Sequence, residues 1–273
     1  KSCMSCRPCG NWSKRPTMFR KIRAAAYLAA FYLWTGVLAV LALPVLVLPR
    51  WAIFAIQVLW ARGVFFLLRW IGGVRQEITG WERIPEGPVL FASKHQSAWD
   101  TIVFFLVRRP PPTFFFKKEL LQIPIYGRFC LRSGMVPVDR AAGARAMRSV
   151  LAMAAERLKE GRSLVLFPEG TRVPVGRKAR YQPGVAGIYK YLDVPVVPVA
   201  LNSGLFWPKA GPTGRTGTLR MEFLDPIPPG LEKDEFLARL SDVLETATAR
   251  LVAQEEQGSP PRIDTGDGAP GGL

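Results

Sequence analysis

Histidine is nearly absent from this chain, because His95 is the only one in 273 residues. Acidic residues are missing from the N-terminal part: no aspartate or glutamate precedes Glu77, whereas eleven lysines and arginines do. The formal charge of the whole chain is +16. Such a one-sided excess of positive charge predicts an anionic partner, either a lipid surface or a polyphosphate.

Cysteine is scarce and unevenly placed. Three of the four cysteines lie in the spacing Cys3-x-x-Cys6-x-x-Cys9, and Cys130 stands alone. A metal or cluster site would need a fourth ligand close to these three. The sequence offers none there, so we expect no metal and no cofactor. The spacing is also unlike a secreted disulfide framework, which favours a reducing compartment.

Signatures of nucleic-acid binding are missing as well. The chain has no zinc-finger spacing and no recognisable RNA-binding pattern. The N-terminal third, by contrast, is strongly apolar. We therefore expect membrane lipids, and no nucleic acid, as partners.

Two long apolar runs stand near the N-terminus. Residues 24–48 are 25 positions without a charge, enough to cross a bilayer core of about 30 Å as a helix. The run is too long for a signal peptide and lacks a small-residue cleavage site. The second run, residues 51–74, carries Arg62 and Arg69, which share one helical face. Because charges at mid-depth are costly, we expect this second helix to lie partly in the headgroup layer.

The charges also predict topology. Seven basic residues precede the first apolar run, which places the N-terminus in the cytoplasm. A helical hairpin then returns the chain to the cytoplasmic face of an inner or plasma membrane. We therefore predict a basic leader over 1–23 that is disordered at its start and a membrane hairpin over 24–75. An α/β domain over 76–255 and a disordered Gly- and Pro-rich tail over 256–273 follow.

After residue 76 the pattern alternates between strands and helices, which predicts an α/β fold with a mixed sheet flanked by helices. Apolar periodicity predicts helices over 142–160 and 233–254. The predicted strands are 89–93, 113–116, 135–138, 163–167, 196–201 and 218–223.

His95 and Asp100 follow the first predicted strand of this domain. On one regular helix the two side chains would point about 140° apart. They can meet if His95 lies in the loop and Asp100 in the first turn of the next helix. The carboxylate then orients the imidazole, and the other ring nitrogen is left as a base. On spacing alone, a histidine that merely ends a strand remains open.

A second stretch strengthens the functional interpretation. The predicted strand 163–167 ends in Pro168-Glu169-Gly170-Thr171-Arg172. Functional loops of α/β sheets lie at the carboxyl ends of strands. Arg172 can bind a phosphate, and Glu169 can hold a substrate hydroxyl or orient the arginine. A solvated basic loop is the alternative.

Two further strand ends carry charge. Gly134-Met-Val-Pro-Val-Asp139-Arg140 ends in an ion-pair candidate that places Arg140 near the same anion. Lys117 follows another apolar strand and offers a point charge to phosphate. A local ion pair between Asp139 and Arg140 on the surface is the alternative for the first of these. A fifth stretch, Val194-Pro-Val-Val-Pro198, is uncharged and favours a core strand.

Together these stretches resemble the glycerolipid acyltransferases, specifically the 1-acylglycerol-3-phosphate acyltransferase family. His95-x4-Asp100 is similar to the catalytic block of the family, Gly134–Arg140 to its second block, Phe167–Arg172 to its third and Val194–Pro198 to its fourth. The resemblance also implies a two-helix membrane motif before the catalytic domain. Lys94 departs from it, because asparagine is common there, and so does Pro137.

The resemblance implies acyl transfer from acyl-CoA or acyl-acyl carrier protein to the 2-hydroxyl of lysophosphatidate. His95 would be the base and Asp100 its orienter, with Lys117, Arg140, Glu169, Gly170, Thr171 and Arg172 in the acceptor site. Backbone N–H groups after His95 are candidates for the oxyanion. Three alternatives stay open: another lysolipid acceptor (a lyso-ornithine lipid or another lysophospholipid), thioester hydrolysis, or a non-catalytic membrane lipid-binding protein of this fold.

Overall fold

The computed structural model describes residues 17–123, 125–139 and 143–258, with the side chains of 143–147 excepted. Its α-helices are α1 (Met18–Leu41), α2 (Arg50–Trp70), α3 (Trp99–Ile102), α4 (Phe104–Val107), α5 (Tyr126–Arg132), α6 (Gly143–Lys159), α7 (Gly184–Leu192) and α8 (Lys233–Glu256). Its strands are β1 (Val74–Thr79), β2 (Leu90–Ser93), β3 (Thr113–Lys117), β4 (Val136–Val138), β5 (Leu164–Leu166), β6 (Val196–Leu201) and β7 (Gly217–Phe223).

The strands form one sheet in the order β1-β7-β6-β2-β5-β3-β4. Leu90 pairs with Leu164 on one side and Val196 on the other, so β2 lies at the centre. All neighbours run parallel except β6 and β7, which are antiparallel. This confirms the predicted mixed α/β sheet.

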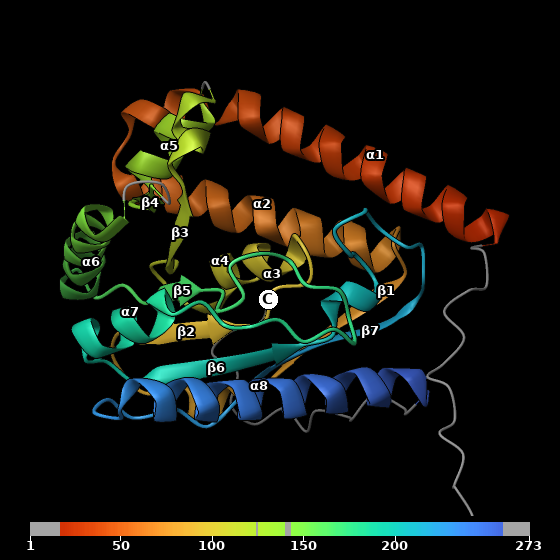
Figure 1. The fold of residues 1–273 in the computed structure, drawn as a ribbon. Helices are drawn as coiled ribbons and strands as arrows, with labels where there is room; N and C mark the ends of the chain where they lie inside the picture. Colours follow the sequence, from red (N-terminus) through yellow and green to blue (C-terminus); the bar gives the residue numbers. More distant parts are fainter. Residues whose placement is uncertain (1–16, 124, 140–142, 259–273) are drawn as a thin grey trace, which may run out of the picture.

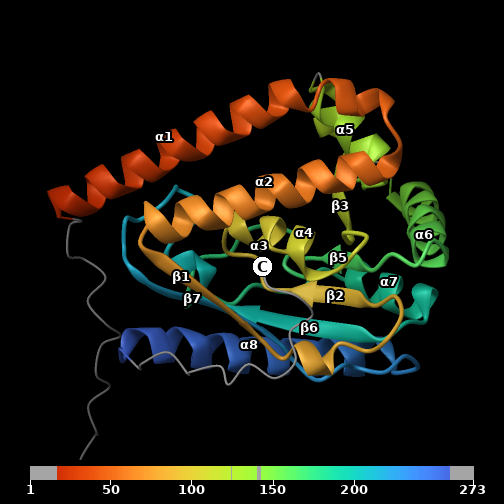
Figure 2. The same ribbon diagram turned by 180° about the vertical axis from the view of Figure 1, so that it is seen from behind.

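Helices cover both faces of the sheet (Figure 1). In β2 the side chain of Phe91 joins the apolar cluster with α2, α3 and α4, whereas Leu90 and Ala92 join a second cluster with α7 and α8. Successive strand residues point to opposite faces, so one short strand supplies both clusters. The fold therefore has three layers, with α2 and α8 on opposite sides of the sheet (Figures 1 and 2).

Helix α2 belongs largely to the folded domain. Ile53, Ala61 and Val64 are fully buried, and Leu68 is nearly so. Hydrophobicity alone does not distinguish a helix that faces lipid from one that faces a protein core. The second apolar run is therefore a roof over the sheet as well as half of a hairpin.

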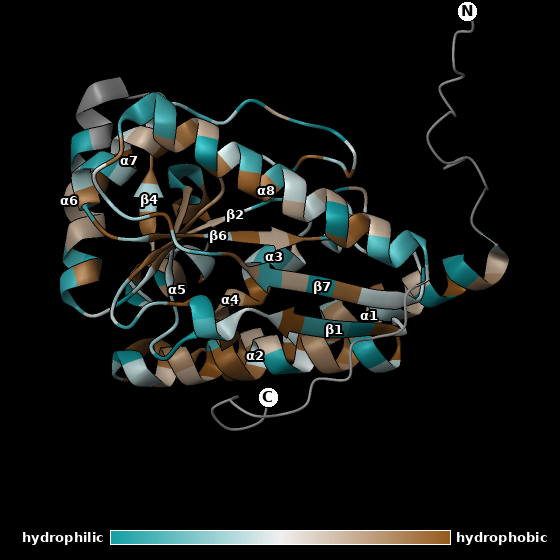
Figure 3. Cartoon of the chain, turned by 90° about the horizontal axis from the view of Figure 1, so that it is seen from below, coloured by the Kyte–Doolittle hydropathy of each residue, from teal (hydrophilic) through white to brown (hydrophobic). Residues whose placement is uncertain are grey.

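Helix α1 lies outside α2 and exposes most of its apolar surface. Leu33, Val37 and Val40 are exposed, and only Tyr27 and Leu38 are buried. Both α1 and α2 are long and apolar enough to cross a membrane. In Figure 3 brown, hydrophobic segments dominate α2, whereas teal segments recur along α8. The two apolar helices suggest association with a membrane.

Some predicted bounds differ from the observed ones. Helix α1 begins at Met18, so Arg20 and Arg23 lie in the helix and not in a leader. Strand β1 was not predicted, and the helices α5 and α7, which lie between predicted strands, were given no bounds because they are short and lack a sustained period. The predictions for the start of the leader, for Arg140 and for the tail beyond Gly258 fall outside the described residues.

Candidate active site

The site lies where the carboxyl ends of several parallel strands meet. The loops that follow β2, β5 and β6 share this edge because the three strands run parallel side by side. The first loop carries His95, the second Glu169 and the third Ser203. The topology thus brings together residues that are far apart in sequence.

His95 and Asp100 meet as expected. His95 lies in the loop after β2 and Asp100 in the first turn of α3, and Nδ1 of the imidazole is 3.2 Å from Oδ2 of the carboxylate. The same Oδ2 accepts the backbone N–H groups of Gln96 at 2.6 Å and Ser97 at 2.7 Å. Oδ1 accepts the hydroxyl of Ser203 at 2.5 Å. Asp100 is fully buried.

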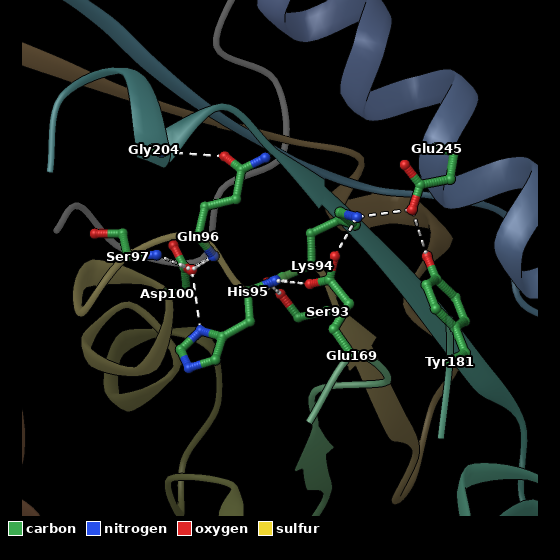
Figure 4. Close-up of polar contacts among 10 residues, drawn as sticks. All are labelled: Ser93, Lys94, His95, Gln96, Ser97, Asp100, Glu169, Tyr181, Gly204 and Glu245. Carbon is green, nitrogen blue, oxygen red and sulfur yellow. Dashed lines mark hydrogen bonds and ion pairs between the residues drawn. The ribbon is translucent and has the colours of Figure 1, made fainter. Parts of the chain in front are cut away.

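These contacts fix the orientation of the histidine. A carboxylate that accepts so many hydrogen bonds can hold only one position, and it favours the tautomer with the proton on Nδ1. Nε2 is then a free base in the wall of a cavity, which His95 lines. Figure 4 shows the imidazole turned away from the network behind it.

The segment after β5 contacts both the ring and the backbone of His95. Its ring stacks on Phe167, with centroids 4.0 Å apart. Its carbonyl accepts the N–H of Val173 at 2.7 Å, and its N–H donates to Oε2 of Glu169 at 2.8 Å. The backbone and ring of the histidine are therefore clamped by one segment.

Glu169, predicted to bind substrate, lines the cavity beside His95 and also supports the catalytic loop. Its carboxylate is buried, and its two oxygens accept the ammonium of Lys94 and the N–H of His95. Among the described residues it forms no hydrogen bond or ion pair with Arg172. Burial raises the pKa of Glu169, while the Lys94 ammonium and the His95 N–H act in the opposite direction.

The expected oxyanion donors are also occupied. The N–H groups of Gln96 and Ser97 both donate to Asp100, and that of Trp99 donates to the hydroxyl of Ser97. These three N–H groups therefore stabilise the catalytic loop itself and do not point to an oxyanion.

A cavity of about 1500 Å³ opens beside His95. Its walls are mainly apolar and come from the helical hairpin, the sheet and α5. They include Leu38, Ala42, Ile56, Trp60, Ile102, Phe105, Phe114, Phe116, Phe129 and Cys130. A large apolar cavity with one base in its wall suits a long hydrocarbon chain with a reactive end.

Cations line the same cavity. They are Lys117, Arg172 and Lys209, and the predicted site residues Gly170 and Thr171 line the cavity beside them. Among residues 17–123, 125–139 and 143–258, no carboxylate forms an ion pair with any of these three cations. Unpaired cations beside an apolar cavity suit an anionic head on an apolar chain.

Sequence reasoning missed Lys94, Ser203 and Lys209. Lys94 stood out only as a departure from the family pattern, and the sequence does not show that its side chain is buried. Ser203 follows β6 with no feature that distinguishes it from other serines. Lys209 lies in an irregular loop, whose path only the structure shows.

Comparison with known proteins agrees with this site. The acyltransferase family model matches residues 75–202. The chain is 35% identical to the 1-acyl-sn-glycerol-3-phosphate acyltransferase of Pseudomonas aeruginosa over 194 residues, which cover 71% of this chain and 74% of that protein. It is 28% identical to the human 1-acyl-sn-glycerol-3-phosphate acyltransferase alpha over 81% of this chain and 79% of that protein.

The fold is similar to a solved structure. The crystal structure of the 1-acyl-sn-glycerophosphate acyltransferase from Thermotoga maritima matches with a TM-score of 0.71 and 24% identity, over 86% of this chain and 98% of that one. The chain therefore belongs to the acyltransferase family that includes the 1-acyl-sn-glycerol-3-phosphate acyltransferases.

Proposed function

We propose that the protein transfers a fatty acyl group from a thioester to the 2-hydroxyl of 1-acylglycerol-3-phosphate and so forms phosphatidate. One observation carries this proposal: Nε2 of an oriented histidine lies at the wall of a large apolar cavity, and the lining of this cavity also holds cations that form no ion pair within the described part of the chain. The donor is acyl-CoA or acyl-acyl carrier protein, which acts as co-substrate. The proposed reaction uses no metal or other cofactor.

His95 acts as a general base in the proposed reaction. Nε2 removes the proton of the 2-hydroxyl while the oxygen attacks the thioester carbonyl carbon. The tetrahedral intermediate collapses, the C–S bond breaks, and the thiolate takes the proton from Nε2. Asp100 stabilises the imidazolium that exists between these two transfers.

Lys117 and Arg172 bind the phosphate of the acceptor, and Lys209 adds a third positive charge. All three line the cavity that also contains His95. Fixing the phosphate holds the 2-hydroxyl beside the base and makes the attack effectively intramolecular. Gly170 and Thr171 shape the loop that presents Arg172, where Gly170 adopts a left-handed backbone with φ of 68°. Arg140 remains a proposed contributor to phosphate binding.

The protein acts at the cytoplasmic face of an inner or plasma membrane in this proposal. Both helices that form the apolar roof of the cavity carry exposed apolar side chains. Arg20 and Arg23 near the start of α1 and Arg69 near the end of α2 suit anionic headgroups. The acceptor then enters from the lipid, and the thioester arrives from the water.

Thiol release from acyl-CoA by the detergent-purified protein, with and without lysophosphatidate, tests the proposal. We expect release to depend on the acceptor and to fall by about 10²- to 10⁴-fold in His95→Ala. An unchanged melting temperature of the variant excludes unfolding as the cause. Release without acceptor would instead indicate hydrolysis, and release only with another lysolipid would reassign the acceptor. Silence with every donor and acceptor would indicate a lipid-binding protein.

A further inference from the structure

Lys94 and His95 are neighbours in sequence whose side chains go to opposite faces of the sheet (Figure 4). Leu90 and Ala92 face α7 and α8, and Lys94 continues that alternation. Its side chain is only 2% exposed. A lysine at this depth requires partners, because an unpaired buried ammonium is costly.

The partners of Lys94 form a chain that ends at the catalytic loop. Its Nζ donates to Oε1 of Glu169 and, at 2.7 Å, to Oε1 of Glu245 in the middle of α8. The same Glu245 oxygen accepts the hydroxyl of Tyr181 at 3.1 Å. The other oxygen of Glu169 accepts the N–H of His95. The sequence of contacts is therefore Tyr181, Glu245, Lys94, Glu169 and the backbone of His95.

One cation serves two carboxylates in this network, the buried Glu169 and the half-buried Glu245. Burial raises the pKa of Glu169, the Lys94 ammonium lowers it and so favours the charged form, and a charged acceptor makes the stronger hydrogen bond to the His95 N–H. Glu245 acts in the opposite sense on Glu169 by like-charge repulsion, which raises the pKa of Glu169. The hydrogen bond from the His95 N–H to Glu169 thus depends on Lys94 and Glu245, which lie across the sheet from the cavity.

We propose that Lys94, Glu245 and Tyr181 are positioning residues for His95, through which α8 contributes to acyl transfer without contacting substrate. This inference rests on the proposed function, because it needs His95 to be the base. The alternative is an ion pair that only fastens α8 to the sheet. A fastening role predicts lower stability with normal turnover by the folded molecules.

The experiment measures kcat, KM and the pH profile of kcat for Lys94→Met and Glu245→Gln. We expect Lys94→Met to lower kcat by about 100-fold, because small displacements of a base are costly, and to leave the KM for lysophosphatidate nearly unchanged. Lys159→Met is the matched control, since this lysine is exposed on α6 and pairs with Glu156 at 3.0 Å. We expect it to behave as the unchanged protein.

The pH profile separates positioning from fastening. Without Lys94 the pKa of Glu169 rises, so Glu169 binds its proton at higher pH and the acid limb of kcat moves to higher pH. Without the charge of Glu245 the pKa of Glu169 falls, so the acid limb moves to lower pH. Both variants keep Tyr181 and Asp100, the other titratable residues of the network and the catalytic loop, unchanged. The two substitutions should therefore shift the limb in opposite directions.

Glu245→Gln keeps the test decisive if Lys94→Met does not fold, because an amide can still accept from both Lys94 and Tyr181. A shifted acid limb in that variant supports the proposal. A kcat within about twofold of normal with an unshifted profile in every folded variant overturns it. If the unchanged protein itself shows no acceptor-dependent thiol release, the proposed function fails instead, and the two failures are distinguishable.

Discussion

At the scale of single residues, Asp100 has two separable duties. It accepts hydrogen bonds from the backbone of the catalytic loop and from Ser203, and it bears the charge opposite His95. The hydroxyl of Ser203 can reverse its hydrogen bond and accept from an amide. Asparagine can therefore replace Asp100 with its oxygen still toward the loop and His95, and only the charge is lost.

We expect Asp100→Asn to reduce kcat by on the order of 10³-fold with little change in KM, because the imidazolium loses its counter-charge. Steady-state kinetics with lysophosphatidate would measure this. Ser203→Ala is the control for orientation alone, and we expect a loss of about 10-fold or less. Equal losses in the two variants would show that orientation, and not charge, is the contribution of Asp100.

Gln57 on α2 is a polar side chain in the apolar cavity. It is only 4% exposed, and its Oε1 has no hydrogen-bond partner among the described residues. An unsatisfied buried amide is destabilising, so we expect Gln57→Leu to raise the melting temperature by about 2 °C, the equivalent of about 1 kcal/mol.

Gln96→Leu is the matched control for that measurement. Gln96 is equally buried, but its Oε1 accepts the N–H of Gly204 at 3.0 Å. We expect this variant to melt at a lower temperature. Thermal unfolding in detergent compares the two, and a fall in both would mean that the Gln57 amide is satisfied in solution.

Residue types at strand ends could be predicted from the sequence, but their partners could not. The contact between His95 and Asp100 could be predicted, because the two residues are close in sequence and a loop followed by a helical turn brings them together. The contact of Glu169 with Lys94, 75 residues earlier, was not predicted, because the order of the strands in the sheet brings the two together. Glu245 lay inside an apolar helical stripe, where a half-buried glutamate gives no signal.

At the scale of elements, α1 and α2 pack closely at one glycine. A methyl group at Gly63 would lie 2.2 Å from the indole of Trp34, whose Nε1 donates to the carbonyl of Trp60 at 3.1 Å. Trp60 in return donates to Thr35 at 3.0 Å. The tryptophans interlock the two helices only because position 63 has no side chain.

We expect Gly63→Ala to lower the stability by about 1–3 kcal/mol, because the indole cannot move without breaking its hydrogen bond. Gly36→Ala is the matched control on α1, where an added methyl group meets nothing within 4 Å. Alanine should raise helix stability there by about 0.5–1 kcal/mol. Melting temperatures measure both, and a stable Gly63→Ala would contradict the interlocked packing.

The elements themselves followed well from the sequence wherever a period was sustained. Strands β2, β3, β5 and β6 and helices α6 and α8 lie within a few residues of their predicted positions. Strand β1 could not be recognised from the sequence, because it follows closely after α2 and the apolar run continues from the helix into the strand. The order of strands was not predictable, since it depends on long-range pairing that local patterns do not encode.

At the scale of the whole molecule, the hairpin cannot be removed as an independent anchor. Ala61 and Val64 of α2 are completely buried in the same cluster as the sheet. Tyr27 of α1 packs edge-on against Trp207, with centroids 5.3 Å apart. A chain that lacks residues 24–74 would expose this cluster, so loss of activity in it would reflect loss of the fold.

Point substitutions on α1 test membrane binding without that difficulty. Leu33 and Val40 are 70% and 66% exposed. We expect Leu33→Glu with Val40→Glu to weaken binding to anionic vesicles by about 100-fold, because each lost apolar side chain is worth about 1.5–3 kcal/mol. Turnover of lysophosphatidate in detergent micelles should be unchanged.

Tyr191→Glu is the control for that pair, because Tyr191 is 56% exposed but lies on α7, on the other side of the sheet. Vesicle co-sedimentation measures all three proteins. Equal weakening by Tyr191→Glu would show that α1 does not face the lipid. The positive N-terminal part suggested a membrane from sequence alone, but the division of α2 between lipid and core could not be seen there.

The shared duty of α2 has a geometric consequence for the proposed enzyme. Phe65 of this helix stacks on Trp99 beside Asp100, with centroids 5.3 Å apart. This helix, which exposes Phe66 and Trp70, is thus also the ceiling of the catalytic loop. The distance between His95 and this exposed apolar surface is therefore set by the packing of the fold.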